Sequence, residues 1–307
     1  MKYLSLMDPL ETVNYKKDTS FVLMKAAKRK GFLTYYLPKN GLHLSSDGVY
    51  FDVQEVTPTD EPSEPFIYGD WVRLTENDVD VVFIRTDPPF DTTYLMHTWI
   101  LDRLPKHVKV MNNPTGIRTV NEKVWALQFK QLIPPTLVTA KYADIYSFLD
   151  KHQKIVVKPT DGFGGQSIHI LEQKSDDSDT ILKQMTNDET NMIIVQRYVP
   201  ESEIGDKRIL LLNGEPLGAI LRVHSETDFR NNFMAGGHAE PTEITERDLK
   251  IITELKPHLK SLGLFFVGID IMGDYLIEVN VTSPTCLQEM NAFYGKCLED
   301  DVISALL

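Results

Sequence analysis

The sequence predicts an α/β protein (α+β in its later part), and its N-terminal part is expected to form an open parallel sheet flanked by helices. The run VDVVFIR at 79–85 is apolar almost throughout, which suits a strand buried on both faces of a sheet. A helical pattern at 92–104 and another short apolar strand at 108–111 follow it. Strand–helix–strand alternation of this kind is typical of a parallel sheet with helices on its faces.

The elements that precede this unit are predicted from local patterns. Residues 3–7 are expected to form a first strand. The polar run 18–20 can cap a helix that continues to Lys30, because Gly31 stands just past the helix end. Segment 39–76 is rich in Asp, Pro, Glu and Thr, so we expect it to be irregular, with a hairpin at the surface.

The second half of the chain begins at a proline pair. A helix is expected near 122–131, and Pro134-Pro135 is the expected domain seam. Thr245 with Asp248 resembles a capping box for a later helix, which Pro257 should kink. The other predicted elements are strands at 136–138, 155–158 and 192–196, helices at 144–151 and 176–188, and a hairpin of 207–212 with 216–223.

Composition excludes several classes of protein. The net charge of −12 argues against a nucleic-acid or anionic-membrane partner, because both select clustered Lys and Arg. The two cysteines, Cys286 and Cys297, are too few for a disulfide framework or a zinc site. The first residues are too polar for a signal peptide, and no run approaches 18 apolar residues. A cytoplasmic protein is therefore expected.

The segment FFVGIDIMGDYLIEVNVTSPTC at 265–286 is the strongest chemical signal. It places Asp270, Glu278 and Asn280 on two adjoining apolar strands, and hard cations such as Mg²⁺ take carboxylate and amide oxygens. A three-residue loop at 273–275 would put Asp270 opposite Glu278, with Asn280 on the same face. A two-residue loop would instead oppose Asp270 to Ile277. The alternative is an ordinary hairpin whose acids face water.

A glycine-rich loop follows the strand that ends at Lys158. Glycines allow backbone N–H groups to close on phosphate oxygens, and a nearby lysine supplies positive charge. The Walker A pattern is absent, and a strand pattern follows the loop, so a dinucleotide fingerprint is also excluded. A mobile turn between two strands is the alternative. Lys123, at the start of the expected helix, could equally be a solvated surface lysine.

Arginines recur near the ends of predicted strands. With a two-residue turn, Arg222 would lie opposite Gly205 and Arg208 opposite Ala219, so both arginines sit toward one end of the hairpin. Arg85 also ends a strand. Converging arginines would suit carboxylates or phosphates through bidentate hydrogen bonds. Structural ion pairs with the many acids are the alternative.

Two loops remain open to more than one interpretation. Residues 196–199 follow a buried strand and could offer backbone groups to an adenine edge, or simply form a chain crossover. Residues 224–240 are polar and contain glycines, which suits either a lid over a reactive intermediate or a plain flexible loop.

Together these segments resemble the bacterial-type glutathione synthetases of the ATP-grasp superfamily over nearly the whole chain. The motifs occur in the family's order: MDP at 7–9, N-x-KKD-[ST]-S-F at 14–21, R-x-DPPFD at 85–91, NEK at 121–123, KP-x-DG-x-GG at 158–165, GDKR at 205–208, AGG at 235–237, VG-x-DI at 267–271 and E-x-NVTSPTC at 278–286.

The resemblance implies a domain organisation. Residues 1–120 would form a pre-ATP-grasp α/β domain with an open parallel sheet. Residues 121–307 would form a two-subdomain ATP-grasp unit, with a small lid subdomain at about 135–200 inside it. ATP would lie between two sheets.

The resemblance also implies roles for individual residues. Those expected to act in catalysis are Lys123, Lys158 and Arg208. Those expected to bind ATP are Lys123, Lys158, Gly162, Gly164, Gly165, Gln196, Tyr198, Val199 and Asp206. Those expected on the substrate side are Arg85, Arg208, Arg222, Arg230, Gly236, Gly237 and Ser283. Those expected to hold Mg²⁺, with Mn²⁺ as an alternative, are Asp270, Glu278 and Asn280.

The implied reaction joins γ-glutamylcysteine and glycine. The peptide carboxylate would attack the γ-phosphate of ATP to give an acyl phosphate, and the glycine amine would then displace phosphate, so no covalent nucleophile is needed. The family commonly forms tetramers, so a homo-oligomer is expected. His238 stands where the family usually has Arg, and this histidine could make activity pH-dependent near neutrality. A ligase for another amine and a non-catalytic nucleotide-binding regulator are the competing hypotheses.

Overall fold

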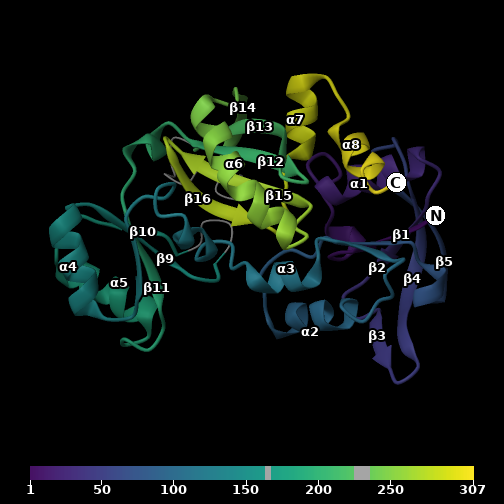
Figure 1. The fold of residues 1–307 in the computed structure, drawn as a ribbon, viewed down its shortest axis with the longest axis horizontal. Coiled ribbons are helices and arrows are strands. Elements are labelled where there is room, and N and C mark those ends of the chain that lie inside the picture. Colours follow the sequence, from purple (N-terminus) through teal and green to yellow (C-terminus); the bar gives the residue numbers. More distant parts are fainter. Residues whose placement is uncertain (163–166, 225–235) are drawn as a thin grey trace.

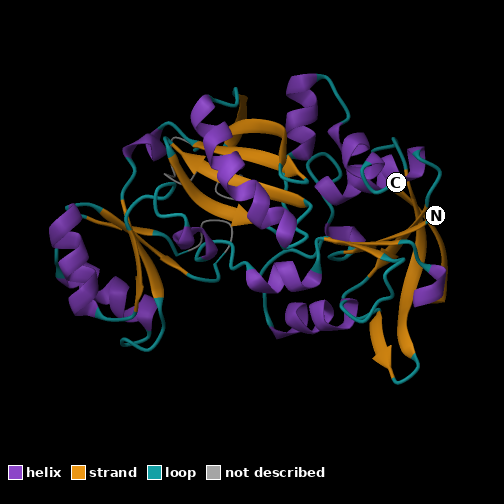
Figure 2. Ribbon diagram, in the orientation of Figure 1, coloured by secondary structure: helices purple, strands orange, loops and turns teal. Residues whose placement is uncertain are grey.

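The computed structural model describes residues 1–162, 167–224 and 236–307 and contains three sheets spread along an elongated molecule (Figure 1). The α/β fold class is confirmed. Figure 2 shows that helices cover faces of each sheet, and that the chain's two ends lie close together at the N-terminal sheet.

The N-terminal sheet has seven strands in the order β3-β4-β2-β1-β6-β7, with β5 paired to β4. Its parallel part, as predicted, consists of β1 (Lys2–Leu6), β2 (Leu33–Leu37), β6 (Val81–Ile84) and β7 (Lys109–Met111). The helices of this region are α1 (Thr19–Arg29), α2 (Thr92–Leu101) and α3 (Pro114–Thr119). The side chain of Asp18 caps α1 by accepting a hydrogen bond from the backbone N of Phe21.

The prediction of irregular structure at 39–76 is wrong for most of that segment. It contains β3 (Leu42–Ser45), β4 (Gly48–Pro58) and β5 (Phe66–Thr75), which extend the parallel sheet with antiparallel strands. The reason is packing: Val49, Phe51 and Val53 alternate along β4 and are buried in the core, which outweighs the polar residues between them.

The second sheet is antiparallel, in the order β10-β9-β11-β8. Its strands are β8 (Thr136–Thr139), β9 (Ile155–Pro159), β10 (His169–Leu171) and β11 (Ile193–Arg197). Helices α4 (Tyr142–His152) and α5 (Asp176–Thr186) pack on it around a small core of its own, which includes Ile145, Leu149, Val157, Leu182 and Val195. This unit forms the far end of the molecule from the chain termini (Figure 1).

The third sheet has the order β14-β13-β12-β15-β16. Its strands are β12 (Asp206–Leu212), β13 (Glu215–Val223), β14 (His238–Pro241), β15 (Phe266–Met272) and β16 (Tyr275–Asn280). Helix α6 (Glu246–Ser261) contains Pro257 and begins with the predicted capping box of Thr245 and Asp248. Helices α7 (Leu287–Tyr294) and α8 (Leu298–Ser304) close the chain, and α8 packs against α1.

The helix predicted at 122–131 is wrong. Only a 3-10 helix forms there, η3 (Trp125–Gln128); the others are η1 (Leu10–Thr12), η2 (Glu76–Asp78) and η4 (Pro200–Glu203). The side chain of Asn121 accepts hydrogen bonds from the backbone N of Lys123 and Val124, and the carbonyl of Glu122 accepts one from Val279 N. These bonds hold the segment as a turn against β16, because side-chain-to-backbone bonds compete with helix formation.

No helix in the described ranges is long and apolar enough to cross a membrane.

Candidate active site

The two faces of the third sheet differ in chemistry. Ile209 of β12, Ile269 of β15 and Val279 of β16 belong to the same core cluster as Ile252 and Leu255 of α6. Since side chains alternate along a strand, the residues between them point away from α6. Those alternate residues include the charged and amide side chains Arg208, Asp270, Glu278 and Asn280. The sheet therefore buries an apolar face under α6 and collects polar ligands on the other.

In the hairpin β15–β16 the predicted pairing of Asp270 with Glu278 is confirmed, but the turn has two residues rather than the three that this pairing was expected to need. Asp270 lies opposite Glu278, yet Met272 pairs with Tyr275 across a two-residue turn. A register shift between Asp270 and Ile271 explains how a two-residue turn is compatible with this pairing. Ile277 is an extra, unpaired residue on β16, so the pairing moves by one residue beyond it. The Nδ2 atom of Asn280 lies 3.3 Å from Oδ2 of Asp270, so the three predicted metal ligands are neighbours.

In the hairpin β12–β13 the predicted register is wrong by one residue. The two-residue turn is present, but a shift between Leu210 and Leu211 places Arg222 opposite Asp206 and Arg208 opposite Ile220. A bulge of this kind cannot be deduced from a turn signal, because it inserts one residue on one strand only.

Both arginines bind carboxylates. The guanidinium of Arg208 donates to both carboxylate oxygens of Asp270, and Nη2 of Arg222 lies 2.9 Å from Oδ2 of the same aspartate. Arg222 also forms a bidentate pair with Asp206. All four residues are buried. Burial by itself would raise the pKa of Asp270, but the two guanidinium groups outweigh it and hold that pKa below its ordinary value.

Two lysines reach the same region from other elements. The ammonium of Lys123 lies 3.0 Å from Oε1 of Glu278 and donates to the carbonyl of Gly162 in the glycine-rich loop. Lys158, at the end of β9, is buried and donates to Oε1 of Gln196 at 3.3 Å. Burial lowers the pKa of Lys158 to about 8, against the attraction of Glu278. The hydrogen-bond partner of Lys158 among the described residues, Gln196, is uncharged.

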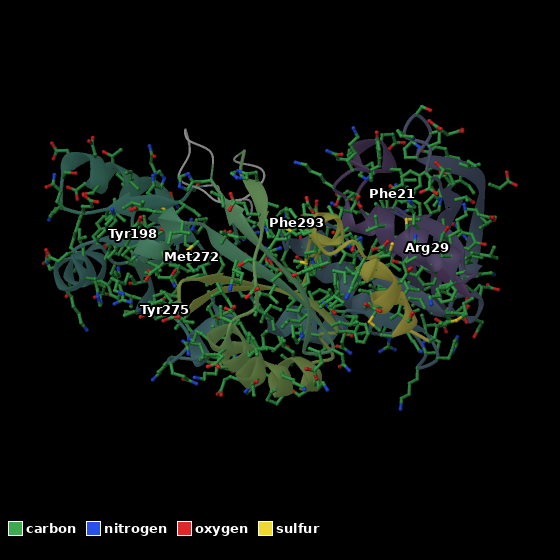
Figure 3. All side chains as sticks on the ribbon, turned by 90° about the horizontal axis from the view of Figure 1, so that it is seen from above. Phe21, Arg29, Tyr198, Met272, Tyr275 and Phe293 are labelled. Atoms are coloured by element: carbon green, nitrogen blue, oxygen red, sulfur yellow. The ribbon has the colours of Figure 1, made fainter. Side chains whose placement is uncertain are left out.

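The predicted adenine linker joins the second and third sheets. Gln196 donates from Nε2 to Thr136 Oγ1 at 2.8 Å, and Val199 is buried. The backbone N of Tyr198 donates to the backbone carbonyl of Lys154. The ammonium of Lys154 lies 4.2 Å from the centroid of the Tyr198 ring. Figure 3 labels Tyr198 in the same part of the molecule as Tyr275, next to the β15–β16 turn.

Two predicted substrate residues lie at the N-terminal sheet. Arg85 follows β6, is buried, and donates from Nε to Ser20 Oγ at 3.0 Å, while its Nη1 atom has no partner among the described residues. Burial lowers the pKa of Arg85, although Asp18 and Asp87 oppose that effect. Ser283 donates to Asp87 Oδ1 at 2.6 Å, which links the loop after β16 to the end of the parallel sheet.

Some predicted residues lie outside the described ranges, namely Gly164, Gly165 and Arg230, together with most of segment 224–240. Gly236 and Gly237 are described, and Gly236 has a positive φ of 89°. His238 is exposed, with Nε2 3.2 Å from Oε1 of Glu240. Its effect on pH dependence stays a hypothesis.

Sequence reasoning missed Glu122. Its Oε1 accepts hydrogen bonds from Val281 N at 2.8 Å, Thr282 N at 3.0 Å and Thr282 Oγ1 at 2.9 Å. Burial, reinforced by the negative charge of Glu278, raises the pKa of Glu122. Its place in the NEK motif at 121–123 was the available signal, but the wrong helix prediction for 122–131 gave this glutamate no role.

The donor set fits a hard divalent cation. Asp270, Glu278 and Asn280 supply two carboxylates and one amide oxygen, which is the chemistry that Mg²⁺ selects. In the part of the chain that the structure describes, no three His, Cys, Asp or Glu side chains form a cluster that could hold a metal. The third protein ligand beside Asp270 and Glu278 would therefore be the amide oxygen of Asn280.

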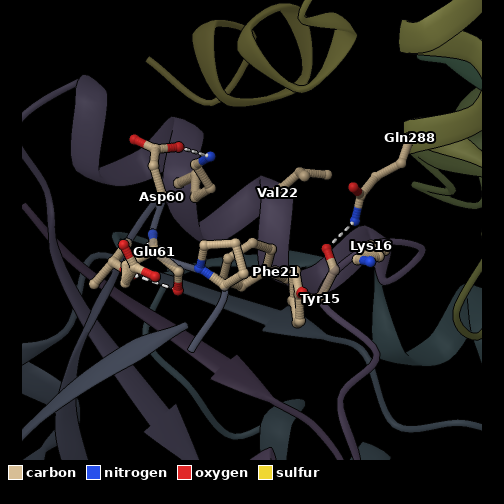
Figure 4. Close-up of a pocket in the computed structure, with 10 residues that line it drawn as sticks. Tyr15, Lys16, Phe21, Val22, Asp60, Glu61 and Gln288 are labelled. Carbon is tan, nitrogen blue, oxygen red and sulfur yellow. Dashed lines mark hydrogen bonds and ion pairs between the residues drawn. The ribbon is translucent and has the colours of Figure 1, made fainter. Parts of the chain in front are cut away.

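A cavity of about 330 Å³ lies elsewhere, between α1 and residues 59–62 (Figure 4). Its lining includes Phe21, Lys25, Asp60 and Gln288, and Lys25 forms an ion pair with Asp60. It contains none of the predicted site residues, so its position does not support a role in the predicted chemistry.

Comparison with protein families gives two matches that together span most of the chain. Residues 1–118 match the prokaryotic glutathione synthetase N-terminal domain, and residues 122–295 match the prokaryotic glutathione synthetase ATP-grasp domain.

Relatives and solved structures agree with these matches. The glutathione synthetase of Vibrio cholerae is 38% identical over 98% of this chain and 95% of its own length, and that of Gloeobacter violaceus is 40% identical over 100% and 97%. A D-cycloserine synthetase superposes with a TM-score of 0.68 at 13% identity, covering 99% of this chain and 100% of its own. A macrocyclase from Microcystis aeruginosa, bound with its precursor peptide, gives 0.65 at 15%, covering 100% and 99%. At such identities these structures share the fold alone, which is an ATP-grasp fold.

Proposed function

The chain belongs to the prokaryotic glutathione synthetase family, and from that premise we propose which of its residues bind the nucleotide, the metal and the peptide. It is an ATP-dependent ligase that joins γ-glutamylcysteine and glycine into glutathione through an acyl phosphate, and releases ADP and phosphate. It uses ATP together with a divalent metal.

The metal is Mg²⁺, held by Asp270, Glu278 and Asn280. The observation that carries this assignment is the single polar face of the third sheet, on which these side chains lie together opposite α6. When bound, the metal would supply positive charge against the phosphates of ATP. Arg208 and Lys123 now pair with Asp270 and Glu278, and these two cations would be available to phosphate oxygens once the metal occupies the carboxylates.

Lys123, Lys158 and Arg208 hold the transferring phosphoryl group. Three cations that approach one region from β9, from the turn before η3 and from β12 can neutralise charge that develops during transfer. Gly162, whose carbonyl already contacts Lys123, belongs to the loop that covers the phosphates. Gln196, Tyr198 and Val199 supply the adenine site, and Asp206 orients Arg222.

The peptide substrate lies on the side of the site that faces the N-terminal sheet. Arg222 and Ser283 are its proposed contacts, because Ser283 links to Asp87 and the parallel sheet. Gly236 and Gly237 are proposed as further contacts of the peptide. Arg85 donates a hydrogen bond to Ser20 and is therefore proposed to act behind the peptide, where it holds the first turn of α1.

The first experiment is ADP release with Mg-ATP, γ-glutamylcysteine and glycine, leaving out each in turn and detecting the product by mass. Glycine-dependent release with a tripeptide product is expected. Release without glycine incorporation would point to another acceptor, and ATP binding without turnover would favour a regulator. Replacing Mg²⁺ by Mn²⁺ in the same assay tests the metal assignment.

We also propose a homo-oligomer, a tetramer in keeping with the family, and a cytoplasmic location where ATP is supplied. Light scattering of the purified chain and fractionation of cells test these two statements. A monomer, or recovery outside the cytoplasmic fraction, would contradict them.

A further inference from the structure

We propose that Glu122 is a positioning residue that fixes the metal-binding end of β16 relative to the phosphate-binding lysine Lys123. One carboxylate oxygen, Oε1, accepts three hydrogen bonds from the two residues that follow Asn280 by one and two positions. The carbonyl of Glu122 accepts a fourth bond from Val279 N at 2.8 Å. Glu122 is therefore hydrogen-bonded to the residues on both sides of Asn280, Val279 and Val281.

The same turn holds the glycine-rich loop. Nδ2 of Asn121 donates to the carbonyl of Thr160 at 3.1 Å, and Lys123 donates to that of Gly162. Lys123 also pairs with Glu278. Residues 121–123 thus contact Thr160 and Gly162, just after β9, and also the end of β16. Strands β9 and β16 belong to two different sheets, so this turn connects them.

Acceptor capacity explains why a carbonyl-type oxygen serves here. The donors at 281 and 282 are two backbone N–H groups and one hydroxyl, and a side-chain oxygen that only accepts hydrogen bonds can take all three. If Glu122 is removed, these partly buried donors lose their acceptor, and the segment 280–283 must rearrange to find others. Asn280 and Ser283 lie in that segment.

The inference rests on the proposed function, because it assumes that Asn280 binds the metal. The experiment measures kcat, the KM for each substrate, the Mg²⁺ concentration for half-maximal activity and the thermal midpoint. Glu122→Ala should raise the Mg²⁺ requirement about tenfold and lower kcat by about 10–100-fold, as loss of an outer-shell partner typically does. The KM for glycine should change little.

Three variants isolate the hydrogen bonds. Glu122→Gln keeps an acceptor oxygen and should stay within about threefold of wild type in its Mg²⁺ requirement. Thr282→Val loses one bond and should raise that requirement severalfold, whereas Thr282→Ser keeps the hydroxyl and should restore it. If Glu122→Ala does not fold, the Thr282 pair decides the question: equal Mg²⁺ requirements for Val and Ser would overturn the proposal.

Glu299→Ala is the matched control. Glu299 is a buried glutamate that accepts hydrogen bonds from Arg29 and Asn291 and lies in α8, away from the site. Its loss should lower the thermal midpoint without changing the Mg²⁺ requirement. If Glu122→Ala behaves in the same way, its role is merely structural. Asn280→Ala tests the premise that Asn280 binds the metal, separately from the role of Glu122. An unchanged Mg²⁺ requirement in that variant would refute the metal assignment.

Discussion

The two hairpins of the third sheet have the same construction and opposite electrostatics. Each has a two-residue turn and then a one-residue register shift. In β12–β13 the shift places Asp206 opposite Arg222, so the hairpin neutralises itself. In β15–β16 the shift places Asp270 opposite Glu278, two acids on one face. The Asp206–Arg222 pair of the first hairpin balances its own charge, whereas the two acids of the second hairpin are balanced by cations from other elements.

The positive charge comes from side chains outside the second hairpin. Asp270 is neutralised by Arg208 and Arg222 of the first hairpin, and Glu278 by Lys123 from the turn before η3. Like charges directly opposite each other on a sheet are destabilising. The pairing of two acids therefore fits the proposed cation site, and the side chains of Arg208, Arg222 and Lys123 balance its charge in the structure.

The largest effect should come from Asp270→Asn. This change removes a proposed metal ligand and leaves two buried guanidinium groups without their shared carboxylate. Activity should therefore fall about 10³-fold and the free energy of unfolding by about 3–5 kcal/mol. Turnover assays and denaturant unfolding measure both. Asp206→Asn should cost similar stability with a smaller loss of activity. Equal losses of activity would erase the distinction between the hairpins.

A smaller effect is expected from Glu278→Gln. The side chain keeps its shape but loses the charge that attracts Lys123 and, as proposed, the metal, so the Mg²⁺ requirement should rise about 10–100-fold. The Lys123–Glu278 pair is partly exposed, with side chains 13% and 22% accessible, so stability should change by less than about 1 kcal/mol. A Mg²⁺ titration of turnover together with a thermal melt checks this. A large loss of stability with normal Mg²⁺ dependence would contradict the comparison.

The third prediction concerns pH. Because the pKa of Lys158 is about 8, the lysine is mostly charged at pH 7 and mostly neutral at pH 9. If Lys158 binds phosphate as proposed, only its charged form does so, and ATP affinity should fall about tenfold from pH 7 to 9, as for one titrating group. Calorimetric titration of ATP at several pH values measures it. Lys158→Arg should be nearly flat over this range, and an equally steep fall in that variant would assign the titration to another group.

The smallest effect on stability should come from breaking an exposed ion pair that has the same bidentate geometry as Arg222–Asp206. Arg73 of β5 donates to both oxygens of Asp52 on β4, but its side chain is 62% accessible. Solvent and salt screen such pairs, so Arg73→Ala should cost no more than about 1 kcal/mol of stability. Urea unfolding measures this cost, and kcat should be unchanged. A loss as large as that of Asp206→Asn would mean that burial does not distinguish these pairs.

Local pattern was sufficient for most elements of the second and third sheets. The apolar strands β9, β11 and β15 and the capped helices α1 and α6 occur close to where their residues predict them. Pattern failed at β4 and β5, where buried neighbours outweigh a polar composition, and at 122–131, where a side chain of Asn121 replaces helical hydrogen bonds. Helices α3, α7 and α8 were also not predicted.

By itself the sequence determined the family, the ligase chemistry and the set of acidic, amide and basic residues, because these depend on which residues occur and in what order. Only the tertiary structure decided which of them are partners. Arg222 faces Asp206, and Asp270 faces Glu278, because Leu217 and Ile277 are each one residue too many for their hairpins. A bulge shifts every pairing beyond it, and its position follows from how both faces of the sheet pack, which no local pattern contains.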